Sequence, residues 1–232
     1  MKSAFSKSFG AVVATLAMFG AASSALAWQS RIEDDGREAL SGKQAERTMR
    51  DFAQCVVANK KREAKALEFL QLPDGDPQQN MQGSAIALSG CAPRGSQMRF
   101  QPELFSRSIY TALYRKYYLK SAPANLAAIA PADYQTEYTA TSIPVGTMQL
   151  ALRTFADCTV KQDGIAAHNF AISEMQSKGE KETVPAVIAA MQQCLNTGAT
   201  LKFSRTILKG LIAESLYKLR SRQRSIALNA AQ

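Results

Sequence analysis

The chain repeats a pattern of residues at a distance of 103 positions, and this repetition constrains the fold more than any other feature. The shift places Cys55 on Cys158 and Cys91 on Cys194, so the two cysteine pairs have equal spacing. Between positions 50 and 114 it produces 13 identities in 65 pairs, where chance would produce about four. We therefore predict a tandem duplication, arranged as two small domains or as one pseudo-two-fold domain.

Each copy is predicted to contain four helices, because apolar residues recur at three- and four-residue steps and strand signals are almost absent. Met81, Ala85 and Leu88 are the apolar residues that the third helix of the first copy is expected to carry. Short extended segments are expected at 97–100 and 200–203. The predicted fold class is all-α, with helices at 43–60, 62–70, 77–91 and 102–118 in copy one and from 147, at 165–176, from 183 and at 204–220 in copy two.

The first 27 residues are typical of a secretory signal peptide. Lys2 and Lys7 precede the apolar stretch Phe9–Phe19, and Ala25-Leu26-Ala27 provides the small residues of a cleavage site. The alternative is a membrane anchor, but the apolar run is short and diluted by polar residues. We expect cleavage near Ala27 and a periplasmic or secreted protein that is not integral to the membrane.

The predicted organisation follows from the repeat and from changes in composition. Three prolines between the copies indicate a connection that wraps one repeat onto the next. The expected segments are a signal peptide at 1–27, a polar segment at 28–42, repeat 1 at 43–120, a Pro/Ala-rich linker at 121–146, repeat 2 at 147–224 and a tail at 225–232.

The four cysteines are expected to form two structural disulfides, since an even number outside the cytoplasm favours bridges. Duplication favours the pairing of Cys55 with Cys91 and of Cys158 with Cys194, which closes each repeat on itself. The competing interpretation is a metal or redox site. The chain has no C-x-x-C motif and a single histidine, so ligand spacing for zinc is missing and we predict neither a metal nor a cofactor.

Candidates for catalysis are few, and each has a structural interpretation. His168 is expected at the surface, and Glu180 and Glu182 in a solvated loop. Glu214 lies within an apolar run, and its counterpart in copy one is Thr111. It is either a partly exposed residue on the polar side of its helix or the buried carboxylate of an envelope hydrolase. We favour a non-catalytic protein and keep the hydrolase as the alternative.

The excess of basic residues gives a formal net charge of +9, which suits a surface that attracts anions. Basic and aromatic residues interleave from Tyr110 to Lys120, and further basic residues follow near the carboxyl end. The candidate binding residues among them are Tyr114, Arg115, Lys116, Lys120, Lys218 and Arg220. They predict binding to an anionic lipid surface, an envelope polymer or an acidic protein, unless they form an ordinary solvated face. Export argues against a nucleic-acid partner.

Two polar residue types recur in both copies, as Arg50 with Arg153 and Tyr114 with Tyr217. We expect each arginine to pair with a carboxylate or a helix end. We expect each tyrosine ring to fill the core, with its hydroxyl bonded to the backbone. A role in ligand binding is the minority interpretation.

The stretches around Phe52–Val57, Phe155–Val160 and Leu208–Tyr217 resemble a group of uncharacterised secreted bacterial proteins. That group carries the pattern F-x-x-C-V…C…L-R-F…L-x-G-x-x-A-E-x-L-Y, often doubled. Copy one departs from it, with Ser106-Arg107-Ser108 in place of Lys209-Gly210-Leu211. The resemblance implies a compartment and a repeat, but no activity. The expected function is therefore that of an exported, non-catalytic helical protein that binds a partner protein or an anionic envelope component.

Overall fold

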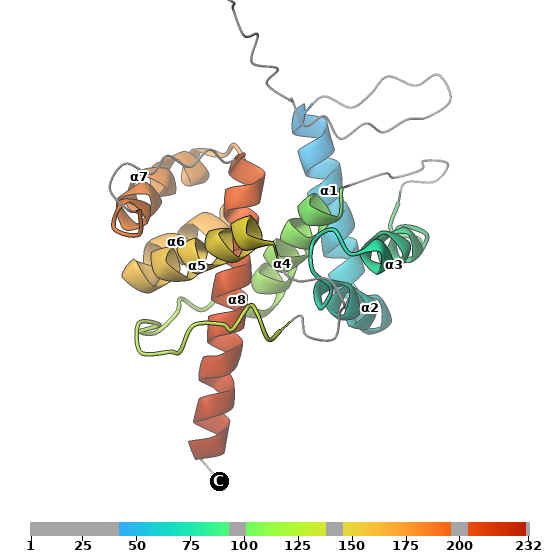
Figure 1. Cartoon of the computed structure of the whole chain (residues 1–232). Helices are drawn as coiled ribbons and strands as arrows, with labels where there is room; N and C mark the ends of the chain where they lie inside the picture. Colours follow the sequence, from blue (N-terminus) through green and yellow to red (C-terminus); the bar gives the residue numbers. More distant parts are fainter. Residues whose placement is uncertain (1–41, 93–100, 138–145, 196–203, 231–232) are drawn as a thin grey trace, which may run out of the picture.

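The computed structural model describes residues 42–92, 101–137, 146–195 and 204–230, and within these ranges it contains eight helices and no strand (Figure 1). The all-α fold class is thus confirmed. None of the helices in the described ranges is both long and apolar enough to span a membrane. The expected signal peptide, the polar segment up to residue 41 and the extended segments at 97–100 and 200–203 lie outside the described residues.

The first half begins its helices with side chains that cap exposed backbone amides. Asn59 accepts hydrogen bonds from the amides of Lys61 and Arg62, and Asp76 accepts one from the amide of Gln78, just after Pro77. Such caps satisfy donors that have no partner within the helix. The helices are α1 (Gly42–Ala58), α2 (Lys60–Leu70), α3 (Pro77–Ala87) and α4 (Pro102–Tyr118).

The second half follows the same order with different helix ends. Ser177 caps the amide of Glu180, so α7 begins earlier than the expected residue 183. Gln176 has a φ of 60°, and α6 ends before it. No Gly or Pro follows Gly210 in the last helix, which continues through most of the expected tail. The helices are α5 (Thr147–Gln162), α6 (Gly164–Ile172), α7 (Lys178–Gln192) and α8 (Arg205–Ala230).

The helices α4 and α8 lie in the centre of the molecule, with α1–α3 on one side and α5–α7 on the other (Figure 1). One apolar cluster joins α1, α2 and α4 around Phe69 and Phe105. A second cluster joins α6 and α8 around Phe170 and Leu216. The side chain of Tyr217 packs against both clusters, so the two cores meet along the α4–α8 pair.

The segment that connects the halves is packed rather than loose over its described part. Leu126 and Tyr134 are buried, and the hydroxyl of Tyr134 donates to Asp157 of α5 at 2.7 Å. Leu126 belongs to the apolar cluster of the second half. This segment therefore extends the second core instead of acting only as a tether.

The central helices α4 and α8 are in close contact at Gly210. A Cβ atom built on Gly210 would lie 2.8 Å from the Cα atom of Arg107. Eleven residues further along both helices, the hydroxyls of Tyr118 and Ser221 are 3.4 Å apart. Since these two contacts join positions in the same order, the helices run in the same direction. Arg107 and Gly210 are also counterparts in the 103-residue shift, so glycine on one helix makes room for arginine on the other.

Two disulfides close the halves separately, with the pairing that the repeat predicts. Cys55 is bonded to Cys91 and Cys158 to Cys194, each across 36 residues. Both bridges join the first helix of a half to the residues that follow its third helix. The described residues contain no free cysteine. These equal bridges are compatible with a duplication, which stays a prediction.

The third helix of the first half presents a different face from the one expected. Met81, Ala85 and Leu88 are exposed, whereas Gln79, Gly83 and Ile86 are buried. The helical step was correct, but the exposed methionine and leucine show that apolar spacing alone does not indicate which face meets the core.

Substituting Gly210 by Ala tests the close helix contact. We expect Gly210→Ala to lower the free energy of unfolding by about 3 kcal/mol, because the new methyl group must push the α4 backbone away. Urea denaturation measures this difference. The matched control is Gly179→Ala in α7, where the nearest atom to a new Cβ would be 3.7 Å away. A Gly210 variant as stable as the control would contradict the packing.

Candidate functional site

A buried cluster of charges lies beside the α4–α8 contact. Glu214 of α8 is fully buried and ion-paired with Arg107 of α4, Arg153 of α5 and Lys218 of α8. Its carboxylate oxygens lie 3.1 Å from the Nε atom of Arg153 and 2.9 Å from the Nζ atom of Lys218. The expectation of a partly exposed glutamate was wrong, because three cations compensate for the loss of water around the carboxylate.

The loop between α2 and α3 completes this charge cluster. The Oδ2 atom of Asp74 accepts hydrogen bonds from Arg107 and Arg153, both at 3.0 Å. Lys218 also contacts Glu137 of the connecting segment at 2.6 Å. With Arg222, which also contacts Glu137, the cluster joins three carboxylates to four basic side chains from five parts of the chain. It confirms that Arg153 pairs with a carboxylate.

The chemistry available to Glu214 follows from its surroundings. Burial alone would raise the pKa of this carboxyl, but the charges of Lys218, Arg107 and Arg153 together hold it well below its usual range. The group is therefore ionised at every physiological pH. It has no proton to give as a general acid, and its two oxygens already accept hydrogen bonds from three cations.

The histidine is buried, contrary to expectation. The Nδ1 atom of His168 in α6 lies 2.7 Å from the hydroxyl of Tyr114 in α4, and the imidazole is only 4% exposed. Burial is the main cause that lowers the pKa of His168. Tyr114 is fully buried as expected, but its hydroxyl contacts this side chain instead of the backbone. The pair joins the two halves, since α4 and α6 belong to different ones.

The predicted anionic-surface residues are spread over several environments. Tyr114 is buried and thus does not belong to any surface. Lys116 contacts Glu63 at 2.7 Å, and Lys218 belongs to the buried charge cluster. The guanidinium of Arg220 stacks over Tyr118, 4.2 Å from the ring centre, and Lys120 is exposed just after α4. The structure therefore does not bring these six residues together as one surface.

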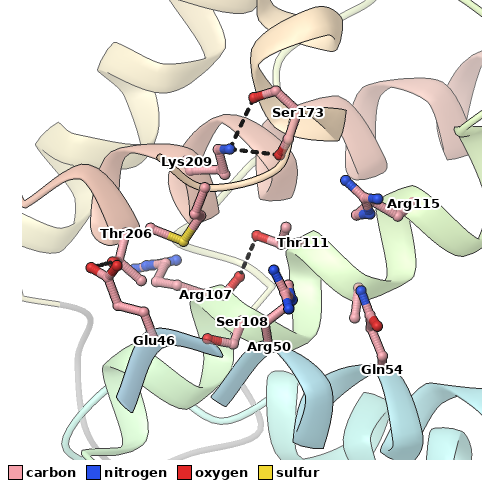
Figure 2. Close-up of a pocket in the computed structure, with 12 residues that line it drawn as sticks. Glu46, Arg50, Gln54, Arg107, Ser108, Thr111, Arg115, Ser173, Thr206 and Lys209 are labelled. Atoms are coloured by element: carbon pink, nitrogen blue, oxygen red, sulfur yellow. Dashed lines mark hydrogen bonds between the residues drawn. The ribbon is translucent and has the colours of Figure 1, made fainter. Parts of the chain in front are cut away.

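Arg115 faces a pocket between the halves, together with Arg50 (Figure 2). The pocket is open to solvent, and its cavity volume is about 40 Å³. Helices α1, α4 and α8 and the loop after α6 form its walls. Its charged lining consists of Arg50, Arg107, Arg115, Lys209 and Glu46.

Two of the four cations of the pocket are committed to buried carboxylates. Arg107 belongs to the buried charge cluster, and the Nζ atom of Lys209 lies 2.7 Å from the Oε1 atom of Glu180. Glu180 is fully buried, so the expectation of a solvated loop residue was wrong for it, whereas Glu182 is exposed. Burial is the main cause that lowers the pKa of Lys209, and the contact with Glu180 opposes this effect.

The carboxylates that contact the other two cations are exposed. Arg50 contacts Asp51 at 3.0 Å and Glu174 at 3.5 Å, and Arg115 contacts Glu174 at 3.8 Å. Arg115 also donates to the carbonyl of Ile172. The carboxylates of Asp51 and Glu174 are 65% and 63% exposed, so water screens these contacts strongly. Arg50 and Arg115 are therefore the cations that a ligand can engage most easily.

Sequence reasoning missed several residues of these two sites. Four residues with buried charges lie in segments whose sequence indicates an ordinary loop or helix: Asp74, Arg107, Glu180 and Lys209. One signal was available: Arg107 and Gly210 stand at the positions where copy one departs from copy two. The described residues include no group of three or more His, Cys, Asp or Glu side chains that could hold a metal ion.

Removal of the Glu214 charge tests the buried charge cluster. We expect Glu214→Gln to lower the free energy of unfolding by about 3–5 kcal/mol at pH 7, because it leaves the surrounding cations without their carboxylate. The control is Glu137→Gln, whose carboxylate is partly exposed and should cost under about 1 kcal/mol.

Acid should reduce the difference between the wild type and Glu214→Gln. A carboxyl whose pKa is depressed in the folded state stabilises the protein above its unfolded pKa, and this contribution is lost as the pH falls. Urea denaturation at pH 6 and pH 3 should show the difference shrinking by about 1–2 kcal/mol. A difference that is constant over this range would show that Glu214 is not held ionised.

Comparison with known proteins adds no identity to these sites. No protein-family model, no curated protein sequence and no solved structure matches this chain.

Proposed function

We propose that this protein is an exported, non-catalytic helical protein that binds an anionic group of a partner protein or of an envelope component. The proposed binding site is the pocket between α1, α4 and α8. One observation carries the proposal: four cationic side chains and a single carboxylate line this pocket. Positive charge that converges in a concavity raises the local concentration of anions more than a flat surface does.

The weak partners of Arg50 and Arg115 support this assignment. An exposed ion pair contributes about 0–1 kcal/mol, so a ligand can replace Glu174 at little cost. The buried ion pairs of Arg107 and Lys209 keep the inner wall of the pocket rigid. The guanidiniums of Arg50 and Arg115 can meanwhile exchange their carboxylate partners. Hydroxyls of Ser108 and Thr111 also line the pocket and retain lone pairs or protons for a polar ligand.

A binding role suits the charge cluster better than the alternative of a Glu214 hydrolase. The carboxylate of Glu214 is buried, ionised and bonded to three cations. Activation of water requires a carboxylate that water can reach or an acid with a proton near neutral pH. Glu214 offers neither, and its role is to join the helices.

Export is part of the same proposal. The amino-terminal sequence has the charge, apolar run and small residues of a cleavable signal. Two disulfides suit an oxidising compartment. Expression of the full chain in a bacterial host should give a processed periplasmic protein whose amino-terminal sequence begins at Trp28. Retention of residues 1–27 on the mature protein would contradict this expectation.

Anion binding can be tested with the purified, oxidised protein. We expect titration calorimetry to detect binding of at least one of acetate, citrate, phosphate and sulfate, weakened by added salt. The double variant Arg50→Gln/Arg115→Gln should weaken binding by roughly tenfold or more.

The matched control is Lys61→Gln/Lys65→Gln, which removes the same charge from two exposed positions on α2. It should bind like the wild type. If none of the four anions binds, or if both double variants bind equally, the pocket is not an anion site.

A further inference from the structure

We infer that the pocket binds a carboxylate group of its ligand. This carboxylate occupies the position that corresponds to the Glu214 side chain on the other side of the α4–α8 pair. This inference rests on the proposed function, since it names the chemical class that the anion site accepts.

The 103-residue shift pairs the cations of the pocket with cations of the buried charge cluster. Arg50 corresponds to Arg153, and Arg115 corresponds to Lys218. Arg153 and Lys218 hold the carboxylate of Glu214 in the buried charge cluster. Arg50 and Arg115 line the pocket. The two sites thus share a pair of cations, one on the first helix of a half and one on its fourth helix.

The sites differ at the position between these cations. The counterpart of Glu214 is Thr111, which also lines the pocket (Figure 2). Thr111 stands four residues before Arg115, as Glu214 stands four residues before Lys218. Its hydroxyl donates to the carbonyl of Arg107 in its own helix at 2.9 Å. Threonine is shorter and carries no charge, so the cation pair is kept while the carboxylate between them is absent.

Without a carboxylate at position 111, the cations of the pocket have weaker partners than those of the buried charge cluster. In the buried charge cluster three basic groups surround the carboxylate of Glu214. In the pocket the guanidiniums of Arg50 and Arg115 meet the exposed Asp51 and Glu174 at its rim.

The geometry of Glu174 indicates how a carboxylate would sit. One of its oxygens lies 3.5 Å from Arg50, and the other lies 3.8 Å from Arg115. A carboxylate therefore already bridges the two guanidiniums, at distances too long for good hydrogen bonds. A ligand carboxylate that enters the pocket displaces Glu174 and contacts both arginines more closely. Ala112 and Met175 offer apolar contact to the next carbons of the ligand.

The first test uses butyrate, its neutral isostere butyramide, and inorganic phosphate as probes of the oxidised protein. We expect calorimetry to show butyrate binding roughly tenfold tighter than phosphate, and no binding of butyramide. If phosphate or sulfate binds as tightly as butyrate and depends on Arg50 and Arg115, the anion site stands and the carboxylate inference is overturned. If no anion binds, both fall.

The second test supplies the missing carboxylate from the chain. Thr111→Glu should abolish butyrate binding and raise the melting temperature by about 3 °C or more, since the new side chain pairs with Arg50 and Arg115. The control Thr111→Gln has the same shape without the charge, and it should block binding without the rise. Thr111→Glu that still binds butyrate, or that melts no higher than Thr111→Gln, would refute the inference.

A third variant leaves the pocket lining intact and should strengthen butyrate binding instead of weakening it. Glu174→Gln removes the competing carboxylate at the rim, so butyrate should bind roughly threefold tighter or more. Unchanged or weaker binding would show that Glu174 does not occupy the place of the ligand carboxylate. This measurement keeps the inference open to refutation even if the Thr111 variants fail to fold.

Discussion

The contact between Arg107 and Glu214 is the interaction on which the arrangement of this chain depends. It joins α4 to α8 near Gly210, whose lack of a side chain lets the two helices pack tightly. Arg153 and Asp74 attach α5 and the α2–α3 loop to the same point. A charge buried this deeply is stable only if its partners stay in place, so the cluster specifies one packing of the two halves.

The same close approach determines where the pocket lies. The side chain of Arg107 extends across α8 into the buried charge cluster. Its counterpart on α8, Gly210, has no side chain. The chain is therefore asymmetric at its centre, although its halves share helix order and disulfides. One side of the α4–α8 pair is filled by charged side chains, and the other keeps open space beside Arg50 and Arg115. The binding proposal follows from this asymmetry.

The helices, the disulfide pairing and the pairing of Arg153 could be predicted, because they depend on local periodicity and on the repeat. The buried charges could not, because burial is decided by which helix faces meet. Glu214 lies on an apolar helix face, and nothing in one sequence reveals that Arg107 and Lys218 compensate for its burial. The pocket could not be predicted either. The sequence shows that Thr111 is the counterpart of Glu214, but only the structure shows which side chains surround each of them.

The two disulfides have a consequence for the connection between the halves. Each bridge lies wholly within one half, so neither disulfide adds a covalent link between the halves to the backbone that runs from Tyr118 to Thr147. A protease that cuts there would release no peptide at once, since α4 and α8 would still hold the fragments by non-covalent contacts. Cleaved protein would then behave as a heterodimer whose lifetime depends on dilution and acidity.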